Sequence, residues 1–432
     1  MKGVKLRKIF VSIISTITIM TGALLGSWSG KANLSFAAVN TENRDNIIRI
    51  GSWYTQEDLK YLKAYLVKTF PDYKFEFEYI AKSNYEPIMD SKLSYKGAPD
   101  IIYVDQEMAE KHARTGYILN LTDMCGDFTD EGRLAFEYGN AVYAVPNTSQ
   151  FVCIYYNKDL LEKAKAPIPV SFESFLASCD YLRLVAGVQP VIASLEDPYD
   201  VADSALGVLS ANYFSTDRGS GFGGRLQYGR TTFQEELHPY MGDWEELLTH
   251  MILTKKMYVI DNRTAVEKFV GEQAAMIVGG PDIYKAVIEA NPDMNIGTLP
   301  FYGTNGARKA IIGGCDVGIA INANSMNPER AKEVVESLTT YEGQMALWKD
   351  RPGSQTYLKD TSFKNGDEFR GIESCYRDGL VFTPWMDWSF ELNKQVHYKL
   401  GRELQKVLLN RETMEDAFDN VDALVKDILQ NG

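Results

Sequence analysis

The sequence predicts an α/β protein with two lobes, and three observations support that fold class. The chain has 432 residues, more than one hydrophobic core usually serves, so two domains are the default. Strand and helix patterns alternate along its first part, as in a sheet covered by helices. Further on, a strand pattern stops at Pro146 and resumes as FVCIYY. Because proline supplies no N–H to a strand ladder, we expect the chain to cross between lobes there.

The segment after residue 46 has the pattern of a βαβ unit. IIRIG indicates a short buried strand, and residues 73–80 alternate aromatic with charged side chains, the period of a second strand. Between them, four apolar residues recur at helical spacing: Leu59, Leu62, Leu66 and Phe70. The order strand, helix, strand predicts a right-handed crossover and a parallel sheet.

A third strand, over Ile101–Val104, ends at the polar cluster Asp105, Gln106 and Glu107. Ligands of open α/β sheets collect beyond the carboxyl ends of the strands, so this cluster is a candidate site. The chain from about Tyr155 to Lys268 reads as mostly helical. Within it, four glycines between Ser215 and Arg225 predict a mobile loop, either a decoration or a ligand lid.

Two long amphipathic segments close the sequence, and each predicts a packing face rather than a cofactor site. The apolar positions are Leu392, Val396, Leu400, Leu404 and Val407, then Met414, Phe418, Val421, Val425 and Ile428.

The first 37 residues have the pattern of an export signal. A basic start is followed by an apolar run from Ile9 to Leu25, and Ser35-Phe36-Ala37 fits a cleavage site. An uncleaved membrane anchor is the alternative, but this run is short for a span and rich in Ser and Thr. We therefore expect a mature chain that begins near Ala38 and is secreted or held at the cell surface.

Charge and cysteine content exclude several classes of function. Loss of the five basic side chains in residues 1–37 takes the formal net charge from −13 to −18. So acidic a chain repels phosphate backbones and anionic lipid, which argues against nucleic acid and membrane surfaces as partners. The five cysteines have no C-x-x-C spacing, so we expect buried thiols with at most two disulfides, and no metal or cofactor.

Several motifs, in order along the chain, resemble the extracellular solute-binding proteins of ABC transporters, specifically the carbohydrate-binding family that includes the maltose-binding proteins. The motifs are GAPDIIYVDQEMAEKHARTGYILNLTDM, YAVPNTSQFVCIYYNKDLLEKA, SLEDPYDVA, FVGEQAAMIVGGPD, VGIAINANSMNPERAKEVVESLTTYEGQ and LNRETMEDAFDNVDALVKDIL. In the N-terminal segment GALLGSWSG, Ser27 stands where the lipid-accepting cysteine of a lipoprotein signal would be, so lipid anchoring there is not available.

The resemblance implies a periplasmic-binding-protein-like fold with two lobes, each a sheet flanked by helices, joined by hinge segments. Carried onto this chain, residues 45–148 with 297–345 form the N-terminal lobe, and residues 149–296 with 346–432 form the C-terminal lobe. The implied function is capture of a mono- or oligosaccharide by hinge closure and delivery to an ABC transporter permease. We expect a monomer and no enzymatic activity.

Position in the resemblance and at strand ends gives the candidate ligand-binding residues. They are Ser52, Trp53, Tyr54, Asp105, Gln106, Glu107, Gln150, Asp197, Tyr199, Asp282, Trp385 and Asp387. A sugar offers an apolar C–H face and a rim of hydroxyls, which aromatic rings, carboxylates and amides can bind.

Alternatives remain open for individual residues and for the function. Trp53 could be a core aromatic, and Asp197 with Tyr199 could simply open a helix at Pro198. Family members often carry a tryptophan where this chain has Asp282, so specificity for maltodextrins is not implied. A secreted glycoside-active enzyme and a sugar sensor or adhesin accessory are the competing functions, although no catalytic motif is present.

Overall fold

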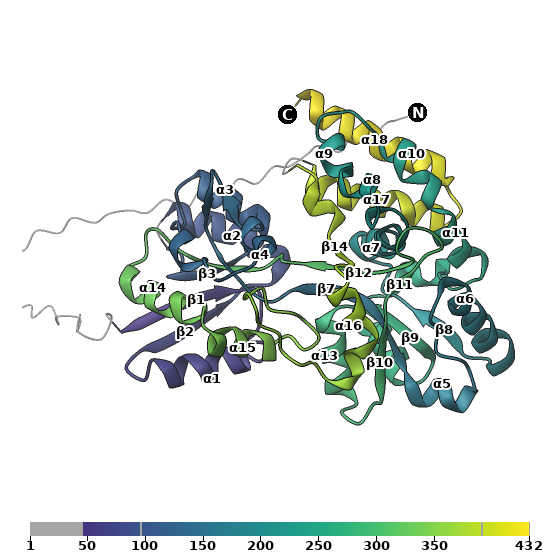
Figure 1. The fold of residues 1–432 in the computed structure, drawn as a ribbon, viewed down its shortest axis with the longest axis horizontal. Coiled ribbons are helices and arrows are strands. Elements are labelled where there is room, and N and C mark those ends of the chain that lie inside the picture. The colour runs from purple at the N-terminus through teal and green to yellow at the C-terminus, as the bar shows by residue number, and fades with distance from the viewer. Residues whose placement is uncertain (1–45, 96, 390–391, 432) are drawn as a thin grey trace, which may run out of the picture. The chain divides into compact units, whose positions relative to one another are not determined.

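The computed structural model describes residues 46–95, 97–389 and 392–431 (Figure 1). The predicted signal peptide, residues 1–37, lies outside them. No helix in the described ranges has the length and apolar character needed to span a membrane.

The first sheet has five strands in the order β2-β1-β3-β13-β6. Strand β1 pairs in parallel with both β2 and β3, which confirms the predicted βαβ pattern. Helices α1 and α15 cover one face of this sheet, and α2 and α3 cover the other (Figure 1). The bounds are β1 Ile47–Ser52, α1 Lys60–Thr69, β2 Lys74–Tyr79, α2 Lys82–Ser94, β3 Ile101–Val104, α3 Gln106–Arg114, β6 Val145–Pro146, β13 Gly318–Ile321 and α15 Tyr341–Lys349.

The second sheet has seven strands, with β11-β12-β7-β9-β8 along its main path and with β10 paired to β7 and β14 to β12. The strands are β7 Gln150–Asn157, β8 Gln189–Ile192, β9 Ala274–Gly279, β10 Ile296–Leu299, β11 Phe301–Tyr302, β12 Lys309–Gly314 and β14 Val381–Phe382. A separate small hairpin joins β4 Glu137–Tyr138 to β5 Ala141–Val142.

The chain passes from the first sheet to the second immediately after Pro146. Strand β6 is the edge strand of the first sheet, where Pro146 stands opposite Gly318. Three residues later β7 begins, and it pairs with strands of the second sheet. The expected crossing at Pro146 is confirmed, because an edge strand is where a residue without an N–H is tolerated.

Two clusters of buried side chains, here called the first and second cores, accompany the two sheets. Residues 296–314 supply three strands to the second sheet, whereas the predicted division assigned residues 297–345 to the first lobe. Strand β10 pairs antiparallel with β7, so its side chains are buried in the second core. The first core resumes at Cys315 and extends to Leu347 and Tyr357, past the predicted limit at residue 345.

The glycine-rich insert is not a loop, so the prediction of a mobile loop was wrong. It forms two short helices, α8 Asp217–Ser220 and α9 Phe222–Leu226, with Phe222 and Leu226 buried. A Cβ at Gly219 would lie 2.0 Å from the Tyr213 carbonyl oxygen. Glycine here permits close backbone approach rather than flexibility.

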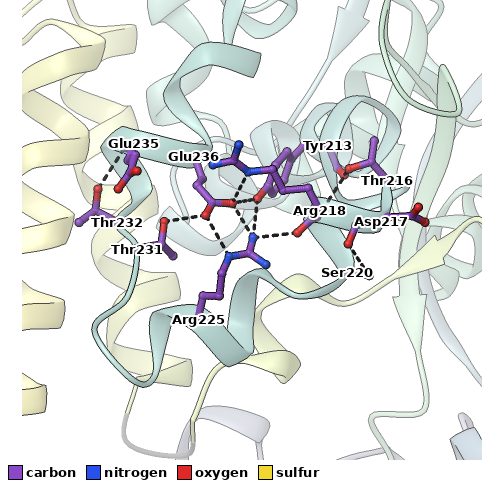
Figure 2. A network of polar contacts seen from close by, with 11 residues as sticks. Tyr213, Thr216, Asp217, Arg218, Ser220, Arg225, Thr231, Thr232, Glu235 and Glu236 are labelled. Atoms are coloured by element: carbon purple, nitrogen blue, oxygen red, sulfur yellow. Dashed lines mark hydrogen bonds and ion pairs between the residues drawn. The ribbon is translucent and has the colours of Figure 1, made fainter.

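A buried carboxylate, Glu236, fixes this insert (Figure 2). Its Oε2 accepts a hydrogen bond of 2.6 Å from Arg225 Nη2, and its Oε1 accepts one of 2.8 Å from the Thr231 hydroxyl. Tyr213 and Arg218 also donate to it. These charge-assisted bonds hold the pKa of Glu236 at about 2, although burial alone would raise it.

The remaining helices surround the second sheet or complete the first lobe. They are α4 Asp130–Leu134, α5 Lys158–Ala164, α6 Phe172–Tyr181, α7 Pro198–Leu209, α10 Phe233–Glu236, α11 Gly242–Thr249, α12 Asn262–Val270, α13 Pro281–Ala290, α14 Pro328–Ser337, α16 Arg370–Arg377, α17 Asn393–Leu408 and α18 Met414–Asn431. The apolar faces of α17 and α18 are buried, as predicted. All five cysteines are buried with free thiols, so none of the allowed disulfides forms.

Candidate functional site

A cavity of about 1050 Å³ is lined by residues of both cores. Eight predicted site residues line it: Trp53, Asp105, Glu107, Gln150, Asp197, Tyr199, Asp282 and Trp385. Four do not: Ser52, Tyr54, Gln106 and Asp387. The cavity thus brings together predicted residues from positions as far apart as 53 and 385.

The four residues outside the lining have other partners or positions. The buried Ser52 hydroxyl accepts a hydrogen bond from the Tyr54 N–H at 2.9 Å. The Tyr54 ring lies under a guanidinium, with the Arg351 Cζ 3.6 Å from its centroid. Gln106 donates through Nε2 to the Cys315 carbonyl oxygen at 2.6 Å. Asp387 is exposed, outside the cavity.

Trp53 is part of the first core as well as of the cavity wall. Only 8% of the residue is exposed, and its ring packs edge-on against Tyr85 and Tyr103, with centroid distances of 5.0 and 6.0 Å. The Lys82 ammonium lies 5.8 Å from the ring centroid, on the cavity side. Most of the Trp53 ring therefore belongs to the core, as the alternative interpretation expected. Only its remaining exposed surface is available to a ligand.

Glu86 of the first-core wall pairs with Lys111 at 3.1 Å, and it shares a second ammonium group with Asp105 and Glu107, that of Lys394 in α17. Its Nζ lies 2.8 Å from Glu86, 2.9 Å from Glu107 and 3.7 Å from Asp105. Asp105 also caps α3 by accepting from the Met108 N–H at 2.8 Å. Burial nevertheless raises the pKa of Glu107 above its usual range, against the opposing effect of Lys394.

On the second-core wall, three carboxylates follow one another along the start of α7. Asp197 caps this helix by accepting from the Tyr199 N–H at 2.9 Å, with Pro198 in the first turn. Asp200 and Asp203 come at spacings of three, so all three lie near one helix face and line the cavity. The helix-opening alternative for Asp197 is therefore correct, and it coexists with a place in the lining.

Asp200 lies among groups that disfavour its charge. Burial, together with the charges of Asp203 and Asp197, raises its pKa to about 7, although the Ser194 hydroxyl, which donates to it at 2.6 Å, acts in the opposite direction. No lysine or arginine of the described residues forms an ion pair with this α7 trio, whose recorded pairing is Asp203 with His397 Nε2 at 2.9 Å.

Aromatic rings stand beside these carboxylates. The Trp385 ring stacks on His397, with centroids 4.3 Å apart and planes at 17°. Tyr199 meets the same imidazole edge-on at 5.0 Å. Trp388, which the sequence pairs with Trp385 across a Met-Asp step, is 4% exposed and belongs to the second core. Trp385 is the member of that pair that reaches the cavity.

Several cavity residues had no place in the sequence prediction: Lys82, Asp200, Asp203, Asp316, Lys394 and His397. The spacing of Asp197, Asp200 and Asp203 around Pro198 was readable in the sequence. Lys394 and His397 lie on a helix that was interpreted only as a packing face, and no local pattern distinguishes them. Among the described residues, no group of three or more His, Cys, Asp or Glu side chains is arranged to hold a metal ion.

Comparison with known proteins places the chain in a family. Residues 60–365 match the bacterial extracellular solute-binding protein family. The chain belongs to this family. Among curated proteins, a multiple sugar-binding protein of Streptococcus mutans is 23% identical over 285 residues, covering 63% of this chain. The match spans 66% of the length of that relative.

Solved structures of solute-binding proteins share the two-lobed α/β fold. RafE in complex with raffinose superposes with a TM-score of 0.72 at 18% identity, over 89% of this chain and 99% of that one. A family 1 extracellular solute-binding protein from Bifidobacterium longum subsp. infantis gives 0.69 at 18% identity, over 87% and 98%. A Bacillus licheniformis sugar transporter in complex with stachyose gives 0.67 at 16% identity, over 88% and 100%. The predicted fold class is confirmed.

Proposed function

We propose that this solute-binding protein captures a mono- or oligosaccharide between its two lobes and delivers it to an ABC transporter permease. One observation carries the proposal: a single cavity is lined by aromatic rings and carboxylates drawn from both cores. Its volume of about 1050 Å³ is at the upper end for small-molecule sites, which supports ligands up to the size of an oligosaccharide.

The chemistry of the lining suits a sugar. Trp385 and Tyr199 offer ring surface to the apolar C–H face of a pyranose, and the carboxyl groups of α7 offer oxygen acceptors to its hydroxyl groups. The amide of Gln150, at the start of β7, adds both a donor and an acceptor close to the crossing. The raffinose and stachyose complexes of the structural neighbours support the same ligand class.

Closure of the lobes accompanies binding in this proposal. The first lobe comprises residues 46–148 with 315–357, and the second comprises most of 149–314 with 358–431, which adjusts the predicted division to the two cores. The crossing segments lie after Pro146, before Cys315 and after Tyr357, and the hinge is placed among them. Export by the signal at residues 1–37, with maturation near Ala38, brings the monomer to the cell exterior.

A secreted glycoside-active enzyme is the second candidate, and Asp200 is the observation that favours it. A carboxyl with a pKa of about 7 beside further carboxyls is the pattern of a general acid in glycoside hydrolysis. The binding-protein proposal requires instead that a bound saccharide be recovered intact.

A thermal-shift screen with raffinose, stachyose, xylo-oligosaccharides and chito-oligosaccharides tests the proposal. A ligand at a hundred times its dissociation constant should add about 2.7 kcal/mol to the free energy of unfolding. Small-angle scattering should then give a smaller radius of gyration with the best ligand, and chromatography should recover that ligand uncleaved. Absence of any stabilising saccharide would overturn the proposed ligand class, and released reducing ends would favour the enzyme.

A further inference from the structure

The ammonium group of Lys394 connects the two cores. Lys394 lies in the first turn of α17, whose Val396 and Leu400 are buried in the second core. Its three recorded carboxylate partners lie on α2 and α3, which pack on the first sheet: Glu86 at 2.8 Å, Glu107 at 2.9 Å and Asp105 at 3.7 Å. Every one of these ion pairs therefore crosses the cavity from one core to the other.

The other lysines of α17 pair differently. Lys399 contacts Glu403 on the same helix at 2.7 Å, and Lys406 contacts Glu403 at 2.6 Å and Glu412, just beyond the helix, at 3.0 Å. Both members of each of these pairs lie in the second lobe, so the pairs do not hold one lobe against the other. Lys394 is the position on this helix where a charge on one lobe meets a carboxylate cluster on the other.

The side chains of Lys394 and its carboxylate partners are partly buried, which strengthens the ion pairs between them. Side-chain exposure is 41% for Lys394, 28% for Glu86, 20% for Asp105 and 18% for Glu107. Partly buried charges are screened less by water and salt than fully exposed pairs, and a network of three carboxylates around one ammonium exceeds a single surface pair. The pKa of Lys394 is accordingly raised by these carboxylates, although its own burial lowers it.

Two further charged contacts cross in the same way. The Lys285 ammonium of α13, in the second lobe, contacts Asp58, whose carboxylate also accepts from the Thr55 N–H at 2.8 Å. Arg351, in the first lobe, has its Nη1 3.8 Å from Asp282 of α13. Opposite charges thus meet between the two lobes at more than one point.

We propose that Lys394 acts as an electrostatic latch that holds the two lobes closed before any ligand has bound. The unliganded protein then exchanges between a closed form, with the Lys394 pairs made, and an open form without them. A ligand enters the open form, and the latch supplies part of the free energy of the closure that follows. The inference rests on the proposed hinge closure but not on the identity of the solute.

Distances between spin labels test the latch without a ligand. Lys68→Cys on α1 and Glu162→Cys on α5 place one exposed label on each lobe, and the five native thiols are buried. In low salt the unliganded protein should give a major short distance and a minor long one. Lys394→Met should raise the ratio of open to closed form about three- to tenfold, and 0.5 M NaCl should do the same to the wild type.

Lys399→Met is the matched control, because it removes an ammonium from the same helix without touching the first lobe. It should leave the distance distribution unchanged, and urea melts should show that both variants fold. The double variant Glu107→Lys with Lys394→Glu exchanges the two charges. It should restore part of the closed population that Lys394→Met loses.

The outcomes separate the latch from the proposed function. If a saccharide shortens the distance but neither Lys394→Met nor salt alters the unliganded distribution, the latch is overturned and solute capture stands. If the distance is the same under all conditions, including every saccharide of the screen, the protein does not close, and both proposals fall.

Discussion

The first-core wall of the cavity presents four carboxylates and the α7 wall three, and their charges are balanced differently. Glu86, Asp105 and Glu107 share the ammonium of Lys394, which reaches them from the opposite core. No lysine or arginine in the described part of the chain forms an ion pair with the α7 trio, and burial raises the pKa of Asp200 in it to about 7, as it does that of Asp316 on the first-core wall. In this cavity, therefore, the charge balance of a carboxylate depends on the charged groups that face it from the other wall. Its position at the start of a helix does not decide it.

The aromatic groups of the two walls give the largest expected contrast. Trp53→Ala should lower the free energy of unfolding by about 3–5 kcal/mol, because the ring packs inside the first core. Trp385→Ala should cost only about 1–2 kcal/mol of stability, since its ring is half-buried at the cavity. It should instead weaken saccharide binding by about 2–3 kcal/mol, roughly 30- to 150-fold.

Urea melts beside calorimetric titrations with the best saccharide of the screen measure both quantities for both variants. A large stability loss in Trp385→Ala with unchanged affinity would return that ring to the core and remove it from the site.

The pH dependence of stability should distinguish the walls next. The folded pKa of Asp200, about 7, lies above its unfolded value of about 3.9, so the ionised carboxylate destabilises the fold above pH 7 and this cost disappears as pH falls toward 4. Asp200→Asn should therefore raise the free energy of unfolding at pH 8 by about 1–2 kcal/mol, and by nothing measurable near pH 4.

Asp105→Asn on the opposite wall is the comparison for this experiment. It removes a charge that is already near Lys394, so no stabilisation at pH 8 is expected. Denaturant melts at pH 4, 6 and 8 are the measurement. An equal gain in both variants would mean that the two walls do not differ in charge balance.

Helix capping is the feature that the walls share, and it gives the smallest effect. Asp105 caps α3 and Asp197 caps α7. Replacement by alanine should cost about 1 kcal/mol of stability at either position, whereas asparagine, which also caps well, should recover most of it at Asp197. Melting curves of these three variants are the measurement, and an alanine replacement that leaves stability unchanged would contradict the capping role at that helix.

Local patterns predicted the parts of the fold that depend on neighbours in sequence. The period of β2 and the strand end at Asp105 were readable because side-chain alternation and burial are local properties. The pairing of β10 with β7 joins residues about 140 positions apart, and nothing in either segment specifies that partner. The boundary predicted at residue 297 therefore failed to follow the sheets.

Parts of the site escaped prediction for a related reason. Lys394 and His397 reach the cavity only because α17 packs beside α7, and their one-dimensional pattern is that of any amphipathic helix. Glycine carries a different ambiguity, since the same residue permits a flexible loop or a tight contact. At Gly223, where a Cβ would lie 2.2 Å from the Asp387 carbonyl oxygen, the contact is the correct explanation.

The packing of α17 on α7 has a mechanical consequence. A Cβ at Gly401 would lie 1.8 Å from the Pro198 carbonyl oxygen, so the two helices touch backbone to backbone directly beside Asp197 and Tyr199. Two turns earlier, the same α17 carries Lys394. Because the crossing point admits no side chain, we expect the two helices to move together, so that the α7 wall and the Lys394 ammonium keep a fixed relation to each other when the second lobe moves.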